Sequence, residues 1–232
     1  MHLFRPFAAL LLLAAPLPAL ACSVAPGYRV PTNMQLAADA DLILLATVTG
    51  GTTDPRRPDD MAITLAPVAA LKGVVPDRPL TLPFMLANGG DTLLSNPYDL
   101  ESAHPQSFAG ACVRYAFPLG TRALFFLKHG EDGGWTSAGG AFSRWAEDVL
   151  TDEAPWLRAV RFYLEVEALP EAERHAALVV RRDEWRALTD DPVAQLLADD
   201  IDRQLAGPNK PLREEPPTIE DNGPATDAGQ AN

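Results

Sequence analysis

The spacing of apolar residues changes near residue 150, and this change limits the possible folds more than any other feature of the sequence. Between about residues 38 and 149, short apolar runs are separated by Gly, Pro, Asp and Asn, which is typical of antiparallel strands joined by turns. From residue 150 to 207 the apolar residues recur with the period of about 3.6 residues that an α-helix requires. We therefore expect an α+β protein, with a β domain followed by a short helical region.

The β region predicts about five short strands joined by long irregular loops. They fall within residues 40–50, 61–73, 78–85 and the two arms of a hairpin over 121–139. The first run is continuously apolar at its start, as expected for a strand buried on both faces. In the third, Leu80 and Phe84 lie on one face, while Pro83 indicates a sheet edge or a bulge. This pattern favours a small antiparallel barrel resembling an OB-fold, and a two-sheet sandwich stays open.

The helical region predicts three amphipathic helices, over residues 151–170, 170–188 and 190–207. Thr151 is the expected cap of the first helix, and an aspartate before Pro192 is the expected cap of the third, which Gly207 ends. Trp156 and Trp185 fall on apolar stripes, so we expect them in the core.

A cluster of acidic residues lies on the third predicted helix. It consists of Asp199, Asp200 and Asp202. Calcium loops place alternating oxygen ligands around a glycine-bearing turn, which a helix does not provide. We therefore expect these carboxylates on the solvated face of the helix.

The two ends of the chain differ from the rest. Residues 1–21 contain Arg5, an apolar run too short to span a bilayer, and the small-residue pattern Ala19-Leu20-Ala21, which together predict a secretory signal peptide. The mature chain would begin at Cys22 and be exported to the periplasm or the outside of the cell. Residues 208–232 are rich in proline and acidic residues and contain no aromatic residue, which predicts a disordered tail.

Charge and motif content exclude several classes of function. The chain carries 31 acidic and 19 basic residues, a formal charge of −12, which disfavours binding to nucleic acid or to an anionic membrane surface. The sequence lacks the G-x-S-x-G, H-E-x-x-H, G-x-x-x-x-G-K and G-x-G-x-x-G motifs, and its histidines lack metal-ligand spacing. We expect a non-enzymatic protein that has no cofactor or resident metal and binds a protein partner.

Cys22 and Cys112 are the only cysteines, and two exclusive fates are open to Cys22. A Cys22–Cys112 disulfide would close a loop of about 90 residues and stabilise the chain by at most about 4–5 kcal/mol. Lipidation would instead place a thioether on the same sulfur. We favour the disulfide, since Ala19 and Leu20 fit a lipoprotein signal poorly and an unpaired thiol is reactive in an oxidising compartment.

Four stretches of the sequence resemble the netrin-like module, the OB-fold of tissue inhibitors of metalloproteinases and of related exported bacterial proteins. They are Cys22-Ser23 at the predicted mature terminus, AADADLILLATVTG, LAPVAALKG and CVRYAFPLGTRALFFL. The resemblance covers residues 22–149. It implies that the α-amine and carbonyl of Cys22 ligate the zinc of a protease, that Ser23 enters the specificity pocket, and that Cys112 clamps the terminus.

Four functions follow from these patterns. We rank an exported interaction module first, because Val24 stands where the inhibitors have a second cysteine. A metalloproteinase inhibitor acting through Cys22 and Ser23 is the alternative, and an envelope lipoprotein anchored through Cys22 is the second alternative. A hydrolase using residues of the 87–110 loop has only the weak support that long loops often carry function.

Overall fold

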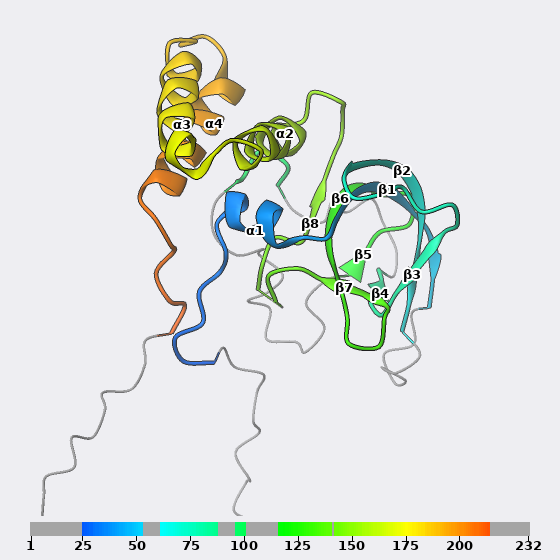
Figure 1. Ribbon diagram of the computed structural model, residues 1–232. Helices are drawn as coiled ribbons and strands as arrows, with labels where there is room; N and C mark the ends of the chain where they lie inside the picture. The colour runs from blue at the N-terminus through cyan, green and yellow to red at the C-terminus, as the bar shows by residue number, and fades with distance from the viewer. Residues whose placement is uncertain (1–24, 53–60, 88–95, 101–115, 141, 214–232) are drawn as a thin grey trace, which may run out of the picture.

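The computed structural model describes residues 25–52, 61–87, 96–100, 116–140 and 142–213 (Figure 1). The strands are β1 (Leu42–Gly51), β2 (Ile63–Lys72), β3 (Leu80–Leu82), β4 (Met85–Leu86), β5 (Ala116–Phe117), β6 (Arg122–His129), β7 (Trp135–Ser137) and β8 (Ala146–Asp148). The helices are α1 (Asn33–Asp39), α2 (Pro155–Glu167), α3 (Glu171–Arg186) and α4 (Pro192–Leu205). The expected α+β class is confirmed.

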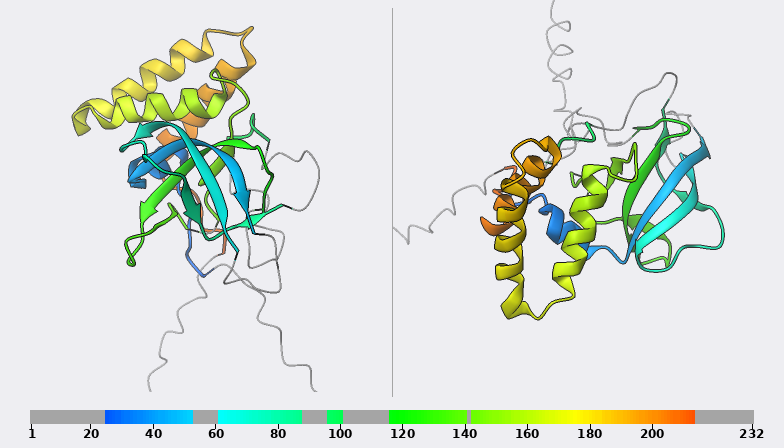
Figure 2. Two further views of the ribbon diagram at one scale, coloured as in Figure 1. Left: turned by 90° about the vertical axis from the view of Figure 1, so that its right-hand side faces the viewer. Right: turned by 90° about the horizontal axis from the view of Figure 1, so that it is seen from above.

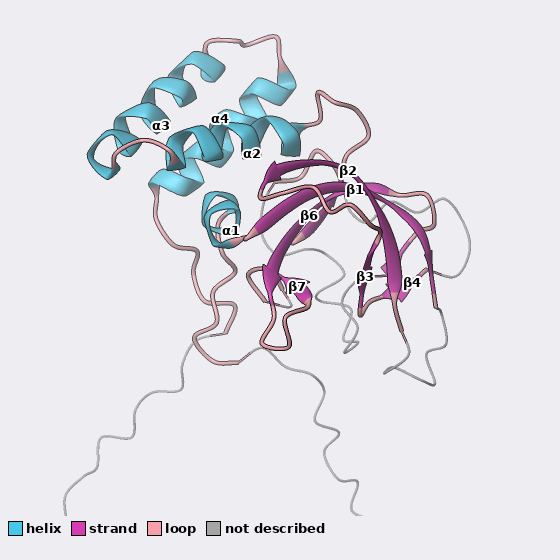
Figure 3. Cartoon of the chain, turned by 45° about the vertical axis from the view of Figure 1, so that its right-hand side comes forward, coloured by secondary structure: helices cyan, strands magenta, loops and turns pink. Residues whose placement is uncertain are grey.

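The main sheet is antiparallel and has the strand order β3-β2-β1-β6-β7. Strands β7 and β8 pair with different parts of β6, on the edge that β1 leaves free. The β1–β2 ladder shifts register at three places, and such irregularities increase the local twist. Figure 3 shows the resulting curvature of the long strands.

Strands β1 and β6 are buried on both faces. The side chains of Leu42–Ala46 and Ala123–Leu127 are all buried, as the apolar run in residues 40–50 predicts for β1. On one face of the sheet, the ring of Phe126 meets Trp156 of α2 edge to face, with centroids 6.0 Å apart. On the other face, Phe125 stacks on Phe117 at 5.7 Å. The sheet is thus the middle layer of the core.

The run 78–85 does not form one strand. Pro83 separates β3, which is the edge strand beside β2, from β4, which pairs in parallel with β5. A proline lacks the N–H that a ladder requires, so the expected edge or bulge at Pro83 takes the form of a break. The predicted hairpin is confirmed as β6–β7.

All three predicted helices are present as α2, α3 and α4, but one predicted cap is wrong. The cap position of α2 is Ala154, without a side-chain hydrogen bond, and not Thr151. Pro155 occupies the first turn, where its fixed φ suits the helix and its missing N–H leaves one donor fewer to satisfy. The aspartate cap of α4 is Asp191, whose carboxylate accepts from the N–H groups of Val193 and Ala194 at 2.9 and 3.0 Å.

The helices gather on one side of the sheet, where α2 lies next to the sheet and α3 lies farther from it (Figures 1 and 2). Lys72 at the end of β2 fixes this arrangement, since its Nζ donates to the carbonyls of Ala37 and Ala38 at 3.1 and 2.7 Å. The same ammonium lies 3.5 Å from Glu167 at the end of α2. None of the helices in the described ranges has the length and apolar character needed to span a bilayer.

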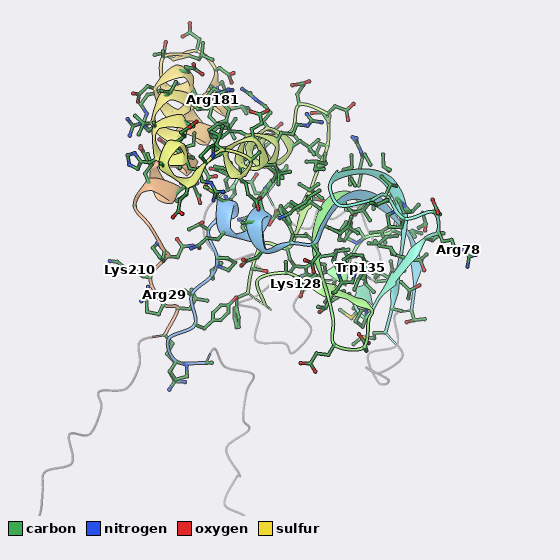
Figure 4. All side chains as sticks on the ribbon, viewed as in Figure 1. Arg29, Arg78, Lys128, Trp135, Arg181 and Lys210 are labelled. Carbon is green, nitrogen blue, oxygen red and sulfur yellow. The ribbon has the colours of Figure 1, made fainter. Side chains whose placement is uncertain are left out.

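The first residues of the predicted tail are ordered. Residues 208–213 lie against residues 27–30, where the Leu212 N–H donates to the Tyr28 carbonyl at 3.0 Å and Asn209 Nδ2 donates to the Val30 carbonyl at 2.9 Å. Figure 4 places Arg29 and Lys210 on these neighbouring segments. The expectation of disorder from residue 208 therefore fails for 208–213, while residues 214–232 lie outside the described ranges.

Candidate functional site

The residues that the sequence singles out as a site lie outside the described part of the chain. This applies to Cys22, Ser23 and Cys112, and to most of the 87–110 loop. The disulfide, the zinc-directed terminus and the lipid anchor therefore stay predictions. The candidate site built from described residues lies instead in the helical region.

A groove of about 610 Å³ lies between α2 and α3, which run side by side and are joined by residues 168–170 (Figure 2). Its apolar lining is Phe162, Val166 and Leu169 on the α2 side and Ala172, Ala176, Ala177 and Val180 on α3. We call this feature the α2–α3 groove. Val180 is 57% exposed, so the groove presents apolar surface to solvent.

The spacing of the lining residues follows from helix geometry. Phe162, Val166 and Leu169 are separated by four and three residues, and Ala176 and Val180 by four, so each set forms one stripe along its element. The alanine side chains of α3 are small, so they leave space in the groove above the backbone of this helix. Two such stripes form the kind of surface against which the ridges of a further helix can pack.

Contacts beside the groove hold α3 in place. Leu178 and Trp185 are its buried residues, and Trp185 meets Phe162 of α2 edge to face at 5.3 Å. Ion pairs then link α3 to α4, with Arg186 Nη2 lying 2.6 Å from Asp199 and 2.9 Å from Asp202. The groove is therefore a fixed surface, built on the packing and ion pairs of the helices around it.

Four charged side chains line the same groove. Arg181 and Glu184 form an ion pair at 3.1 Å, and the Arg181 guanidinium lies over the rings of Phe162 and Trp185, 5.1 and 5.6 Å from their centroids. Glu165 and Glu173 are exposed, and neither forms an ion pair with a described residue. The groove thus combines an apolar floor with a net acidic rim.

Asp200 corrects the expectation for the acidic cluster on α4. Its carboxylate is buried, whereas Asp199 is exposed on the solvated side as predicted. Oδ2 accepts from the Tyr163 hydroxyl at 2.6 Å, and Oδ1 accepts from Asn33 Nδ2 at 2.9 Å and Arg203 Nη2 at 3.2 Å. These contacts join α1, α2 and α4 around one buried charge.

Burial dominates the titration of this cluster. It raises the pKa of the Asp200 carboxyl, although the hydrogen bond from Tyr163 and the charge of Arg203 oppose the shift. Burial, followed by the negative charge of Asp200, raises the pKa of Tyr163 well above its usual value. The hydroxyl therefore stays protonated and acts as a hydrogen-bond donor, which suits a structural role at the helix junction.

A second buried charge cluster links β8 of the sheet to Asp99 and to Trp156 of α2. Arg144 binds Glu147 through two hydrogen bonds, from Nε at 2.6 Å and from Nη2 at 2.9 Å, and both side chains are buried. The guanidinium also lies 3.4 Å from Asp99 and 5.4 Å from the centroid of the Trp156 ring. The opposite charges neutralise each other inside the fold, so we assign this cluster a structural role as well.

The sequence contains a signal for the α2–α3 groove, namely a second apolar stripe on α3 that the helical period of its larger apolar residues does not reveal. The predicted stripe of α3 contains Leu178 and Trp185, which face the core. Ala176 and Val180 form a second stripe on another side of the helix, but alanine contributes little to a hydrophobic pattern. Two apolar stripes on one short helix are what indicate a helix with two partners, one of them outside the core.

No metal centre supplements this surface, since the described residues contain no group of three or more His, Cys, Asp or Glu side chains able to hold a metal ion. Comparison of the chain with protein-family models, with curated proteins and with solved structures found no match. The functional assignment therefore depends on the physical features of the chain.

Proposed function

We propose that this chain is an exported, non-enzymatic interaction module whose α2–α3 groove binds a helical segment of a partner protein. The observation that carries the proposal is the apolar lining between two helices, in which Val180 is 57% exposed and Ala176 is exposed, while Val166 and Phe162 lie buried beneath them. A fixed apolar groove between helices is a recurring site for an amphipathic helix.

The dimensions of the groove support a helical ligand. Helix α2 has 13 residues and α3 has 16, so their lengths are about 20 and 24 Å at the rise of an α-helix. A ligand helix of similar length would contact both stripes along the groove. The small side chains at Ala176 and Ala177 allow its backbone to come close to α3.

The other parts of the proposal concern export and the β domain. The leader at residues 1–21 supports an exported protein in the periplasm or outside the cell. The antiparallel arrangement and the register shifts of β1 support an OB-fold-like barrel over residues 22–149, in keeping with the netrin-like resemblance. The inhibitor and lipoprotein alternatives depend on Cys22 and Ser23, and none of the described residues favours them over groove binding.

The test compares substitutions inside and outside the groove. An amphipathic synthetic helix with a fluorescent label and a Leu/Ala stripe is titrated with the full chain, and binding is followed by anisotropy. We expect A176Q/V180Q to weaken binding by about tenfold or more, because polar side chains replace apolar contacts in the floor. The matched control is V68Q on β2, where a valine of similar exposure, 51%, lies outside the groove.

Two results would contradict the proposal. One is that the unsubstituted chain fails to bind such a helix. The other is that V68Q weakens binding as much as A176Q/V180Q does, since the helix would then bind apolar surface in general. Circular dichroism and the urea midpoint of each variant check that the fold is intact.

A further inference from the structure

The acidic rim of the α2–α3 groove is uneven along its length. Glu165 lies near the end of α2 and Glu173 near the start of α3, so both lie toward the connection at residues 168–170. Glu184 lies in the last turn of α3, toward the opposite end of the groove. The two ends of the groove therefore offer different charges to a ligand.

At the end distant from the connection, the negative charge is already balanced. Arg181 pairs with Glu184 at 3.1 Å, and the rings of Phe162 and Trp185 hold its guanidinium. Figure 4 shows Arg181 at the α2 and α3 region of the molecule. A cationic side chain of the ligand would gain little binding energy at this end, because Arg181 already pairs with Glu184.

At the end near the connection, two carboxylates stay available. Arg174, which follows Glu173 in the chain, uses its guanidinium to donate to the carbonyls of Leu169 and Glu167 at 3.0 and 2.8 Å. Within the described residues, neither Glu165 nor Glu173 forms an ion pair. The ammonium of Lys72 lies against Glu167 and the end of α1.

We infer that the helical ligand of the groove is cationic, with Lys or Arg residues flanking its apolar stripe at the end that lies near residues 168–170. Glu165 and Glu173 are the residues that select this charge. The inference rests on the proposed function, since it names the chemistry of the segment that the groove binds. Charge complementarity of this kind sets specificity and the rate of association more than total affinity.

The charge of the whole chain acts in the same direction. A formal charge of −12 repels an acidic helix and attracts a basic one before contact is made. Such long-range attraction is not specific to the groove, so a test must separate it from the local effect of Glu165 and Glu173. Variants with the same change in net charge, placed elsewhere, provide that separation.

The experiment uses three labelled synthetic helices of about 16 residues with an identical apolar stripe, since this length matches α3. The flanking positions at one end are Lys, Gln or Glu. Each is titrated with the full chain at about 20 mM and about 500 mM NaCl, where the Debye length falls from about 20 Å to about 4 Å. We expect the Lys helix to bind about tenfold tighter than the Glu helix at low salt, and the ratio to shrink at high salt.

The decisive variant is E165Q/E173Q, with D77N/E131Q as its control. Asp77 and Glu131 are exposed on the β2–β3 connection and on the β6–β7 turn, so the control has the same net charge but leaves the groove intact. We expect E165Q/E173Q to reduce the preference for Lys over Glu about fivefold, and the control to reduce it by less than about twofold.

Equal binding of the three helices would overturn the inference while leaving groove binding in place. An equal loss of preference in E165Q/E173Q and D77N/E131Q would also overturn it, because the selection would then come from net charge. If none of the helices binds, the proposed function and this inference fail together.

Discussion

The strand pair β1–β6 buries its apolar side chains within the chain, whereas the helix pair α2–α3 leaves some of its apolar side chains exposed. Every residue of Ala123–Leu127 in β6 is buried, because helices cover one face of the sheet and aromatic rings cover the other. In α3, only Leu178 and Trp185 of 16 residues are buried, and ion pairs from Arg186 also link it to α4. The sheet is covered on both faces by other parts of the chain, whereas the helix pair leaves an apolar surface that another molecule can cover.

The largest expected effect separates these two regions directly. Phe125→Ala removes a ring that packs against Phe117 and Trp145, so it should lower the free energy of unfolding by about 3–5 kcal/mol. Val180→Ala in the groove should change it by no more than about 0.5 kcal/mol. Urea denaturation of both variants measures the difference. Similar losses would mean that the groove is part of the core.

A smaller effect is expected at the junction between the helices. Asp200→Ala leaves the Tyr163 hydroxyl and the Asn33 amide without their buried acceptor, which should cost about 2–3 kcal/mol. Asp199→Ala, one position earlier on the same helix, removes an exposed ion pair and should cost at most about 1 kcal/mol. Equal costs in thermal or urea unfolding would contradict the assignment of Asp200 as the buried member of the acidic cluster.

The caps of the helical region allow a further comparison. Asp191→Ala removes an acceptor for two N–H groups at the start of α4 and should cost about 1 kcal/mol. Thr151→Ala should have almost no effect, because α2 begins after Ala154 without a side-chain cap. If Thr151→Ala proves the more destabilising of the two in the same unfolding assay, the start of α2 has been placed wrongly.

The smallest expected effect is a pH dependence. Burial raises the folded-state pKa of Asp200 above its ordinary value of 3.8, so the fold prefers the protonated carboxyl. The resulting stability is complete below the ordinary pKa and is lost as pH rises through the folded pKa. The free energy of unfolding of the unsubstituted chain, minus that of Asp200→Asn, should therefore decrease as pH rises from about 3.8. A difference that increases with pH would contradict this shift.

Periodic features of the fold could be predicted from the sequence because they depend on local patterns. The apolar run of β1, the hairpin β6–β7 and the three long helices are examples. The burial of Asp200 could not be predicted, since its partners Asn33 and Tyr163 are 167 and 37 residues away along the chain. The Thr151 cap was wrong because Pro155 provides an alternative start for the helix.

The candidate site was harder to predict than the fold. A groove requires two elements at a known distance, and the low hydrophobicity of Ala176 and Ala177 conceals the second stripe of α3. The cysteine-based prediction drew on Cys22, Ser23 and Cys112, which lie outside the described residues and stay predictions. Sequence patterns therefore located the helices but not the surface between them.

The most direct test of groove binding is a methyl NMR titration of the full chain with the lysine-flanked helix. We predict that the methyl resonances of Val166, Leu169 and Val180 shift together and saturate at one equivalent, while those of Val68 and Val74 on the sheet side stay unchanged. Shifts centred on Val68 and Val74, or no shift at the groove methyls, would contradict the assignment of the α2–α3 groove as the binding site.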